Sequence, residues 1–330
     1  MPAKMLQTGV YRNGDEHMIA IIMAVYNGET YLNEQIDSLL SNTEKDFVLH
    51  IFDDGSTDRS AAVIQSYTDK YPSKIFYHRN VTNQGVIHNF LNGCLQVDAD
   101  YYMFCDQDDI WKKDKIEITF NKMKQAEERY GRDFPLLVHG DVEVIDENGN
   151  INADSMFEMS HINADSKLPQ ILIQNHVTGC TMMCNKKLIA GISEYASSEY
   201  IIMHDYLAAL YASVFGKIEV IKKPLLSYRQ HSGNSVGAKN NNNPVYLLKR
   251  LANGRKSYKE AMETSRNQVK FFVEIYREEL AAEKYCKEYE LMSGYASLGS
   301  RAKLYRIMFY KKNHIWKNGT IRKIMQVIWG

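Results

Sequence analysis

The chain has 330 residues, 45% of them hydrophobic, so it can form one large domain with a substantial core and a smaller extension. Lys and Arg number 40, as do Asp and Glu, so no global charge indicates a nucleic-acid partner. Five scattered cysteines predict reduced thiols in a cytoplasm rather than a disulfide framework. The polar N-terminal tail, 1–17, is unlike a signal peptide, and no apolar run reaches the roughly 18 residues of a transmembrane helix.

The first half of the chain alternates strand and helix patterns. Strands are predicted at 18–25, 47–52, 75–78 and 101–105. Helices are predicted at 32–40, 58–71, 86–97 and 112–130. The first strand is continuously apolar, which is typical of a strand buried on both faces of a parallel sheet. Strands separated by helices of this length predict βαβ units with right-handed crossovers, and therefore an α/β fold.

The rhythm changes after residue 110. Further strands are predicted at 136–145, 177–184 and 217–221, with helices at 169–175, 186–192 and 205–214. A turn at 147–150 can close a hairpin. The asparagine run 240–243 and Pro244 indicate a linker, so we expect one α/β domain over 18–238 and a helical region over 239–330.

Acidic side chains follow two of the predicted strands. Asp53 and Asp54 end the second strand, and Asp106 and Asp108 follow the fourth. Ligands of open parallel sheets bind at these strand ends, and carboxylates gathered there repel one another unless a cation or hydrogen-bond donors are near. Turn formation and helix capping are the alternative roles, and they explain Asp58 better than the Asp106-x-Asp108 pair. Two carboxylates at that spacing can hold one hard divalent cation.

Several other kinds of site are disfavoured. No G-x-G-x-x-G follows a predicted strand, and no G-x-x-x-x-G-K-[ST] phosphate loop is present. A diphosphate bound without such a loop needs a metal ion, which the Asp106-x-Asp108 pair provides for. Cys180 and Cys184 lie in an apolar run without a second ligand pair, so we interpret them as small buried hydrophobic residues.

Six segments together resemble glycosyltransferase family 2, whose members have the GT-A fold. They are Met-Ala-Val-Tyr-Asn-Gly at 23–28, Phe-Asp-Asp-Gly-Ser-Thr-Asp at 52–58, Asn-Gln-Gly-Val at 83–86, Cys-Asp-Gln-Asp-Asp-Ile-Trp at 105–111, Met-His-Asp-Tyr at 203–206 and Tyr-Arg-Gln-His-Ser-Gly-Asn at 228–234. The forms at 105–111 and 228–234 are most similar to the bacterial rhamnosyltransferase branch, which builds surface polysaccharides. The resemblance implies a Rossmann-like, mostly parallel sheet flanked by helices, with the catalytic domain over 18–238.

The resemblance also implies the roles of individual residues. The nucleotide part of the donor is expected to contact Tyr26, Glu29, Asp53, Asp54, Asn83, Gly85 and Asp106. Mg²⁺ or Mn²⁺ is expected on Asp106, Asp108 and His231, where it stabilises the leaving nucleotide diphosphate. Asp205 is the expected general base, which takes the proton of the acceptor hydroxyl in a single inverting displacement. The alternatives are that Asp205 caps a helix and that His231 is structural.

Two positions depart from the wider family. Many members have Ala-Arg-Asn after the Asn-x-Gly segment, whereas this chain has His88-Asn89-Phe90-Leu91 and lacks that arginine. Many also have Glu-Asp where this chain has His204-Asp205. Both changes fit the rhamnosyltransferase-like branch.

The implied function is an inverting, metal-dependent glycosyltransferase of the hexosyltransferase class, acting in surface-polysaccharide synthesis. The expected donor is dTDP-rhamnose, with a UDP-hexose as the alternative, and the expected acceptor is a lipid-linked saccharide. A nucleotidyltransferase normally has a Gly-rich basic loop where this chain has Tyr26-Asn27-Gly28-Glu29. A non-catalytic polysaccharide-binding protein is the remaining alternative, and the intact acids argue against it.

The last thirty residues, 301–330, contain eight Lys or Arg and no Asp or Glu. Aromatic residues are interleaved with these cations. This composition predicts either peripheral contact with the inner face of the cell membrane or an ordinary basic helix that covers the core. A homodimer is also compatible with the sequence.

Overall fold

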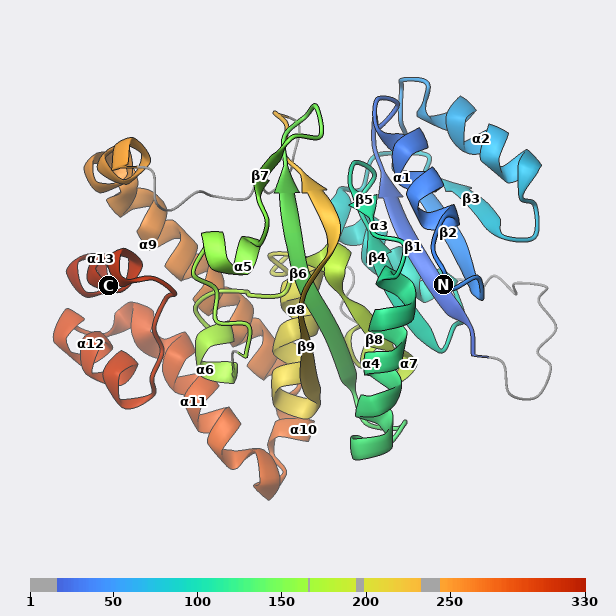
Figure 1. Cartoon of the computed structure of the whole chain (residues 1–330). Coiled ribbons are helices and arrows are strands. Elements are labelled where there is room, and N and C mark those ends of the chain that lie inside the picture. The colour runs from blue at the N-terminus through green and yellow to red at the C-terminus, as the bar shows by residue number, and fades with distance from the viewer. Residues whose placement is uncertain (1–16, 166, 194–198, 233–243) are drawn as a thin grey trace. The chain divides into compact units, whose positions relative to one another are not determined.

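The computed structural model describes residues 17–165, 167–193, 199–232 and 244–330, with the backbone alone described for 244–253 (Figure 1). Two compact units are present. The first lies within 1–155, 177–198 and 203–236, and the second within 156–176, 199–202 and 237–330. The predicted division at residue 238 stays a prediction.

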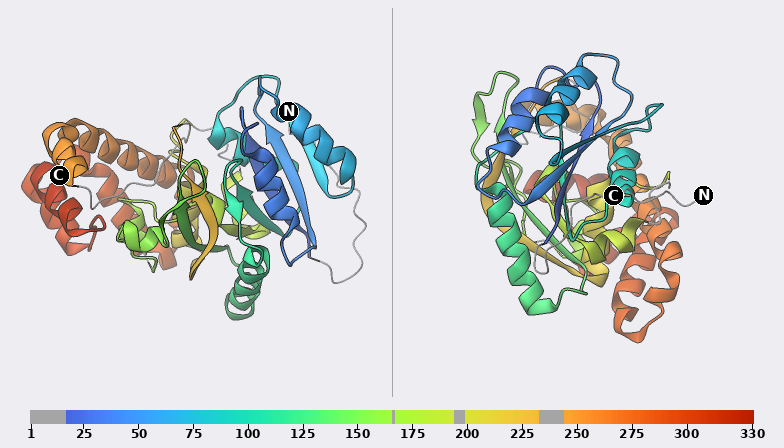
Figure 2. Two further views of the ribbon diagram at one scale, coloured as in Figure 1. Left: turned by 45° about the horizontal axis from the view of Figure 1, so that its top comes forward. Right: turned by 90° about the vertical axis from the view of Figure 1, so that its right-hand side faces the viewer.

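The first unit is built on a nine-stranded sheet (Figures 1 and 2). Its strands are β1 (Ile19–Val25), β2 (Phe47–Asp53), β3 (Ile75–Arg79), β4 (Tyr101–Cys105), β5 (Ile110–Trp111), β6 (Leu136–Ile145), β7 (Ile151–Ala153), β8 (Met183–Asn185) and β9 (Lys217–Arg229). The order is β3-β2-β1-β4-β8-β6-β9-β5, and β7 pairs with β6. Strands β1 to β4 pair in parallel, whereas β8 is antiparallel to both of its neighbours.

Helices cover both faces of this sheet. They are α1 (Leu32–Leu40), α2 (Ser60–Lys70), α3 (Val86–Gln96), α4 (Lys115–Tyr130), α7 (Lys186–Ile192) and α8 (His204–Phe215). The first, second and fourth lie on one face, and the other three lie on the opposite face (Figures 1 and 2). Strands β2 and β4 are buried along their whole length, as the apolar runs predicted.

The order of the strands reverses between β1 and β4. The chain runs outward from β1 through β2 to β3, and then returns through α3 to place β4 on the other side of β1. Open α/β sheets bind their ligands in the crevice at such a reversal, outside the carboxyl ends of the strands. The loops after β1, β2 and β4 therefore lie where the acidic clusters of the sequence were expected to act.

Three predicted elements of the second half were wrong in type or length. The predicted strand at 177–184 is a 3-10 turn, η1 (Gly179–Thr181), followed by the short β8, because glycine and a tight turn occupy its centre. The predicted strand at 217–221 extends through β9 to Arg229, since residues 224–229 pair with β6 beyond two register shifts. The predicted helix at 169–175 is only α6 (Leu168–Ile171). The hairpin closed by the turn at 147–150 is confirmed by the pairing of β6 with β7.

The second unit is helical in its described part. It contains α5 (Met156–Met159), α6, α9 (Pro244–Ile275), α10 (Arg277–Leu280), α11 (Cys286–Ala296), α12 (Lys303–Lys312) and α13 (Thr320–Trp329), with 3-10 turns η3 (Glu283–Tyr285) and η4 (Ser297–Ser300). Its core contains Phe272 of α9 and Tyr295 of α11, both fully buried. The asparagine run predicted as a linker lies outside the described residues. None of the described helices combines the length and the hydrophobicity that crossing a bilayer requires.

Candidate active site

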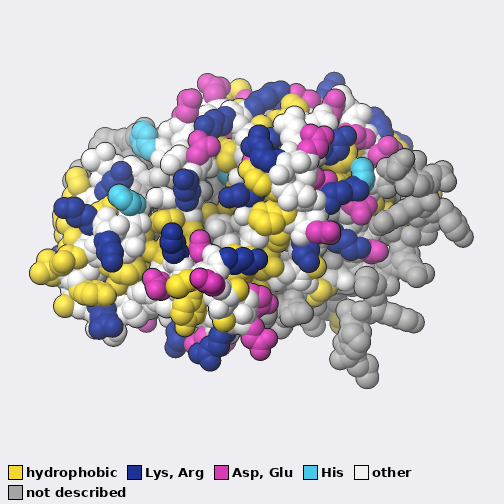
Figure 3. Space-filling view, turned by 90° about the horizontal axis from the view of Figure 1, so that it is seen from below, with side chains coloured by type: hydrophobic (Ala, Val, Ile, Leu, Met, Phe, Trp, Pro, Cys, Tyr) yellow, Lys and Arg dark blue, Asp and Glu magenta, His cyan; other side chains and the backbone are white. Residues whose placement is uncertain are grey.

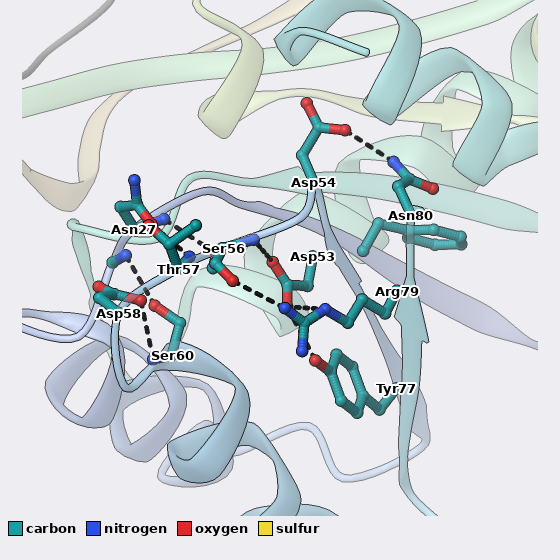
Figure 4. Close-up of polar contacts among 12 residues, drawn as sticks. Asn27, Asp53, Asp54, Ser56, Thr57, Asp58, Ser60, Tyr77, Arg79 and Asn80 are labelled. Atoms are coloured by element: carbon teal, nitrogen blue, oxygen red, sulfur yellow. Dashed lines mark hydrogen bonds and ion pairs between the residues drawn. The ribbon is translucent and has the colours of Figure 1, made fainter. Parts of the chain in front are cut away.

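The loops after β1 and β2 are joined by hydrogen bonds (Figure 4). Asn27, which has a positive φ of 50°, donates its backbone N–H to Ser56 Oγ at 2.9 Å and accepts from the backbone N–H of Thr57 at 2.8 Å. The carboxylate of Glu29 accepts the backbone N–H of Arg59 at 2.8 Å, at the start of α2. Glu29, a predicted nucleotide contact, thus holds the second loop in place.

Asp53 is fully buried at the end of β2 (Figure 4). One carboxylate oxygen accepts the backbone N–H of Ser56, and the other accepts the hydroxyl of Tyr77, each at 2.8 Å. Arg79 Nε lies 3.6 Å from the second oxygen. These bonds join the ends of β2 and β3, so the buried carboxylate is stabilised by donors within the chain.

Asp54 holds the loop that precedes α3. Its carboxylate accepts the side-chain N–H of Asn80 at 2.8 Å and the backbone N–H groups of Gln84 and Gly85 at 2.9 and 2.8 Å. Asn83, exposed on this loop, also accepts from the N–H of Gly85, at 3.1 Å. Asp54, Asn83 and Gly85, all predicted to contact the nucleotide, thus lie together.

Gly85 has a φ of +83° and a ψ of 156°, a region of backbone space that is essentially restricted to glycine. We expect Gly85→Ala to lower the free energy of unfolding by about 2 kcal/mol and to displace the loop held by Asp54. Donor affinity, measured by calorimetry, should therefore fall by about tenfold or more.

Gly131 offers a matched control. It follows α4 with a φ of 94° and a ψ of 149°, and at both glycines an added Cβ would meet no atom within 4 Å. Gly131→Ala should thus cost similar stability and leave donor affinity unchanged. Equal loss of affinity in both variants would contradict a specific role for the Gly85 loop.

The loop after β1 is tied to the loop after β4 by one side chain. Gln107 accepts the backbone N–H of Tyr26 at 2.8 Å and donates to the Tyr26 carbonyl at 3.2 Å. A Cβ on Gly28 would lie 2.4 Å from the Gln107 amide oxygen, so glycine allows this close approach. The side chain of Tyr26, predicted to lie beside the nucleotide, is 48% exposed and available to a ligand.

The four-residue acidic segment after β4 divides its carboxylates between two groups. Asp106 and Asp109 each offer an oxygen to a cluster with Cys180 Sγ, whose ligand atoms all lie within 4.8 Å of one another. The Asp108 carboxylate instead lies 2.7 Å from His231 Nε2. The structure therefore brings two of the predicted metal ligands, Asp108 and His231, into contact, but it places the third, Asp106, in the group with Asp109 and Cys180.

Burial and charge crowding perturb these acids. Burial raises the pKa of Asp106 to about 7, with further contributions from Asp108 and Asp205. Burial, followed by Asp106 and Asp108, also raises the pKa of Asp109 well above its usual range. Carboxylates that repel one another in this way form a site in which the binding of a cation is strongly favoured.

Arg229, at the end of β9, fixes the acidic segment from the opposite side. Its backbone N–H donates to Asp109 at 3.2 Å, and its side-chain Nε donates to the carbonyl of Asp108 at 2.9 Å. A further guanidinium nitrogen pairs with Glu34 of α1 at 2.5 Å. The guanidinium also lies 4.6 Å from the ring centroid of Tyr31, whose ring is 5.1 Å from that of His231.

Asp205 lies in the first turn of α8, and its Oδ2 accepts the backbone N–H of Gly179 at 3.1 Å. Gly179 is followed by Cys180, whose Sγ clusters with Asp106 and Asp109, so Asp205 lies near the acidic segment. The preceding His204 is buried against the rings of Phe90 and Phe104, and burial lowers its pKa to about 3. His204 is therefore a neutral core residue, whereas Asp205 is only partly buried.

A buried lysine interacts with the acidic cluster. Lys115 is fully buried, with Nζ 4.1 Å from the Trp111 ring centroid and no hydrogen-bond partner among the described residues. Burial lowers its pKa to about 8, against the opposing influence of Cys180, Cys105 and Asp109. This positive charge offsets part of the negative charge that the acids bring to the end of β4.

Comparison with known protein families identifies the family of the segment that contains most of this site. Residues 20–131 match the family described as glycosyl transferase family 2. This segment is a glycosyltransferase family 2 domain. It contains β1 to β4, the loops around the order reversal and the acidic segment, so the predicted family and the predicted enzyme class, a glycosyltransferase, are confirmed.

Curated relatives agree with this assignment. The dTDP-rhamnosyl transferase RfbG of Shigella flexneri is 28% identical over 232 residues, which cover 66% of this chain and 74% of RfbG. An uncharacterized glycosyltransferase of Haemophilus influenzae is 37% identical over 134 residues, or 40% of this chain and 50% of that protein. This chain thus spans only half the length of the second relative.

Solved structures show the same fold. Residues 1–349 of S. aureus TarS superpose with a TM-score of 0.56 at 15% identity, covering 90% of this chain and 77% of that one. The complex of TarS with UDP-GlcNAc gives the same TM-score at 16% identity and covers 83% of this chain and 70% of that one. The predicted GT-A α/β fold is therefore confirmed.

Proposed function

We propose that this enzyme transfers L-rhamnose from dTDP-rhamnose to a saccharide acceptor, with inversion and with Mg²⁺ or Mn²⁺ bound. The observation that supports the chemistry is the gathering of acids near the end of β4. Asp108 contacts His231, and Asp205 accepts the N–H of Gly179, the neighbour of Cys180 in the Asp106 cluster. The similarity to RfbG, whose name states a dTDP-rhamnosyl donor, supports the choice of sugar.

The residues at this strand end fit a divalent cation. The proposed donor set is Asp106, Asp108 and His231, of which Asp108 and His231 are in direct contact while Asp106 lies with Asp109 and Cys180. Carboxylate oxygens and an imidazole suit Mn²⁺ or Mg²⁺. Asp109 Oδ2, buried without a hydrogen-bond partner among the described residues, offers a further oxygen at this strand end. The bound ion supplies Lewis-acid stabilisation to the departing diphosphate.

The protein itself orients both substrates. Tyr26, Asn83 and Gly85 line the loops at the order reversal, where the nucleotide is proposed to bind. Asp205 takes the proton of the acceptor hydroxyl while that oxygen attacks the anomeric carbon from the face opposite the diphosphate. One displacement without a covalent intermediate inverts the anomeric carbon.

We further propose a polyprenyl-linked saccharide as acceptor, at the cytoplasmic face of the cell membrane and in the synthesis of a surface polysaccharide.

The cysteines support the proposed cytoplasmic location. All five are free, including the buried Cys94, Cys105, Cys180 and Cys184, as expected of a reducing compartment. The proposed domain division is a catalytic domain at 18–238 and a helical region at 239–330.

The testing measurement is nucleotide-diphosphate release from dTDP-rhamnose, UDP-glucose, UDP-galactose, UDP-GlcNAc and a GDP-sugar, with Mn²⁺ and with a chelator. We expect metal-dependent release that is fastest from dTDP-rhamnose. Release from a UDP-sugar alone would replace the donor and keep the reaction class. Turnover that the chelator leaves unchanged would contradict the role given to Asp106, Asp108 and His231.

A further inference from the structure

Helices α12 and α13 of the second unit expose an unusual amount of apolar side chain. In α12, Leu304 is 71% exposed and Met308 is 62% exposed, and the two are spaced to lie on one face of the helix. In α13, four exposed side chains recur at helical spacing: Ile321, Ile324, Val327 and Ile328. These apolar outward faces differ from those of surface helices in water-soluble proteins, whose outward face is polar.

The inward face of α13 is occupied separately. Met325 and Gln326 are buried, and the Gln326 amide donates to the carbonyl of Ile315 at 2.8 Å and accepts the backbone N–H of Lys317 at 3.0 Å. The helix is therefore anchored through one side while its isoleucines point outward. Packing within this unit does not account for the outward stripe.

Two cations of α12 hold the helices side by side. Lys303 Nζ donates to the carbonyl of Ile328 at 2.6 Å, and Arg306 donates to the carbonyl of Gly330 at 3.1 Å. These bonds bring the start of α12 next to the end of α13. The exposed side chains of both helices, namely Leu304, Tyr305, Met308, Ile321, Ile324, Val327 and Ile328, are named here the apolar stripe.

The charge around the apolar stripe has one sign. Residues 301–330 carry eight Lys or Arg and no Asp or Glu, and Lys311, Lys312 and Lys323 are exposed beside the stripe. Figure 3 shows hydrophobic side chains next to Lys and Arg on the surface of this unit, on the left of the view. Apolar side chains bordered by cations match the boundary between the headgroups and the acyl chains of an anionic bilayer.

We propose that the apolar stripe binds the surface of a membrane that contains anionic lipid, with α12 and α13 lying in the interface. A second copy of this chain fits the stripe poorly, because a symmetric contact would place the cations of 301–330 against themselves. A bilayer receives the isoleucines among its acyl chains while the long lysine side chains reach the headgroups. Binding to lipid requires neither the donor nor the metal, so this inference goes beyond the proposed reaction.

The test is co-sedimentation of the whole chain with vesicles of phosphatidylglycerol and phosphatidylcholine, and with vesicles of phosphatidylcholine alone. We expect binding to the anionic vesicles that weakens with salt and falls by about tenfold or more in the double variant Ile324→Asp, Ile328→Asp. Lys323→Glu should weaken binding by about fivefold or more. Circular dichroism and donor turnover in solution check that each variant is folded.

Ile151→Asp is the matched control. Ile151 lies on β7 in the first unit and is 58% exposed, close to the 54% of Ile328. It should bind vesicles like the unaltered chain. Vesicle binding that is absent, or equal in the stripe variant and the control, would overturn the proposal. So would a soluble oligomer that Ile324→Asp, Ile328→Asp dissociates, because the stripe would then be an interface between copies.

Discussion

Asp108→Asn is expected to lower metal-dependent release of nucleotide diphosphate from the donor by about a thousandfold. The substitution removes one negative charge from the proposed ion site and keeps the size of the side chain. Asp108 lies 2.7 Å from His231, so the variant also weakens the contact that holds the proposed third ligand. The measurement is the rate of release at saturating donor over a range of Mn²⁺ concentrations, together with Mn²⁺ affinity by calorimetry.

The control is Asp98→Asn. Asp98 lies just before β4, at its amino end, and pairs on the surface with Lys186, whereas Asp108 lies beyond the carboxyl end of the same strand. This variant should retain activity within about twofold, because an exposed ion pair contributes little. If Asp108→Asn bound Mn²⁺ and released product like Asp98→Asn, the proposed metal site would be wrong.

The second large effect is expected from Asp205→Asn. An amide cannot accept the proton of the acceptor hydroxyl, so sugar transfer should slow by a factor of about 10² to 10⁴. The amide oxygen can still accept the N–H of Gly179, which Asp205 accepts at 3.1 Å, so the fold and donor affinity should be kept. Transfer to a saccharide acceptor and donor binding are measured separately on the same preparation.

Helix capping is the alternative role of Asp205, and Glu117→Gln isolates its effect. Glu117 is likewise an acid in the first turn of a helix, α4, and accepts a hydrogen bond from Thr43 at 2.7 Å. Neutralising such an acid costs about 0.5 kcal/mol of helix stability. If Asp205→Asn slowed transfer no more than Glu117→Gln, Asp205 would be a helix-stabilising residue and another group would be the base.

The first half of the fold was predictable because its signals are local. The strands β1, β2 and β4 are apolar runs broken by turn residues and are almost wholly buried, whereas the edge strand β3 is mostly only partly buried. The far end of the sheet was not predictable in this way. Strand β5 is only two residues long, and residues 224–229 are extended because β6 lies beside them. Such pairings depend on partners distant in the chain.

The candidate site shows the same division. Asp106, Asp108 and Asp205 carry a recognisable spacing, and their position at strand ends follows from the fold. Arg229 and Gln107 gave no comparable signal, although both stand inside segments quoted for the family resemblance. Their importance lies in bonds to backbone groups of loops far away in sequence, 121 residues away for Arg229 and 81 for Gln107. Residue types alone do not reveal such bonds.

The two register shifts between β6 and β9 bear on which changes in chain length this enzyme can tolerate. Gly140 pairs with Ile221 and Asp141 with Pro224, so Lys222 and Lys223 are extra residues on the β9 side, and both are exposed. A residue gained or lost there alters only the size of a surface bulge. Between Ser227 and Arg229, where the pairing with β6 is regular, a single insertion would turn the guanidinium to the other face of the sheet and away from the acids. Homologues should therefore vary in length at the bulge and keep a constant spacing from Ser227 through Arg229 to His231.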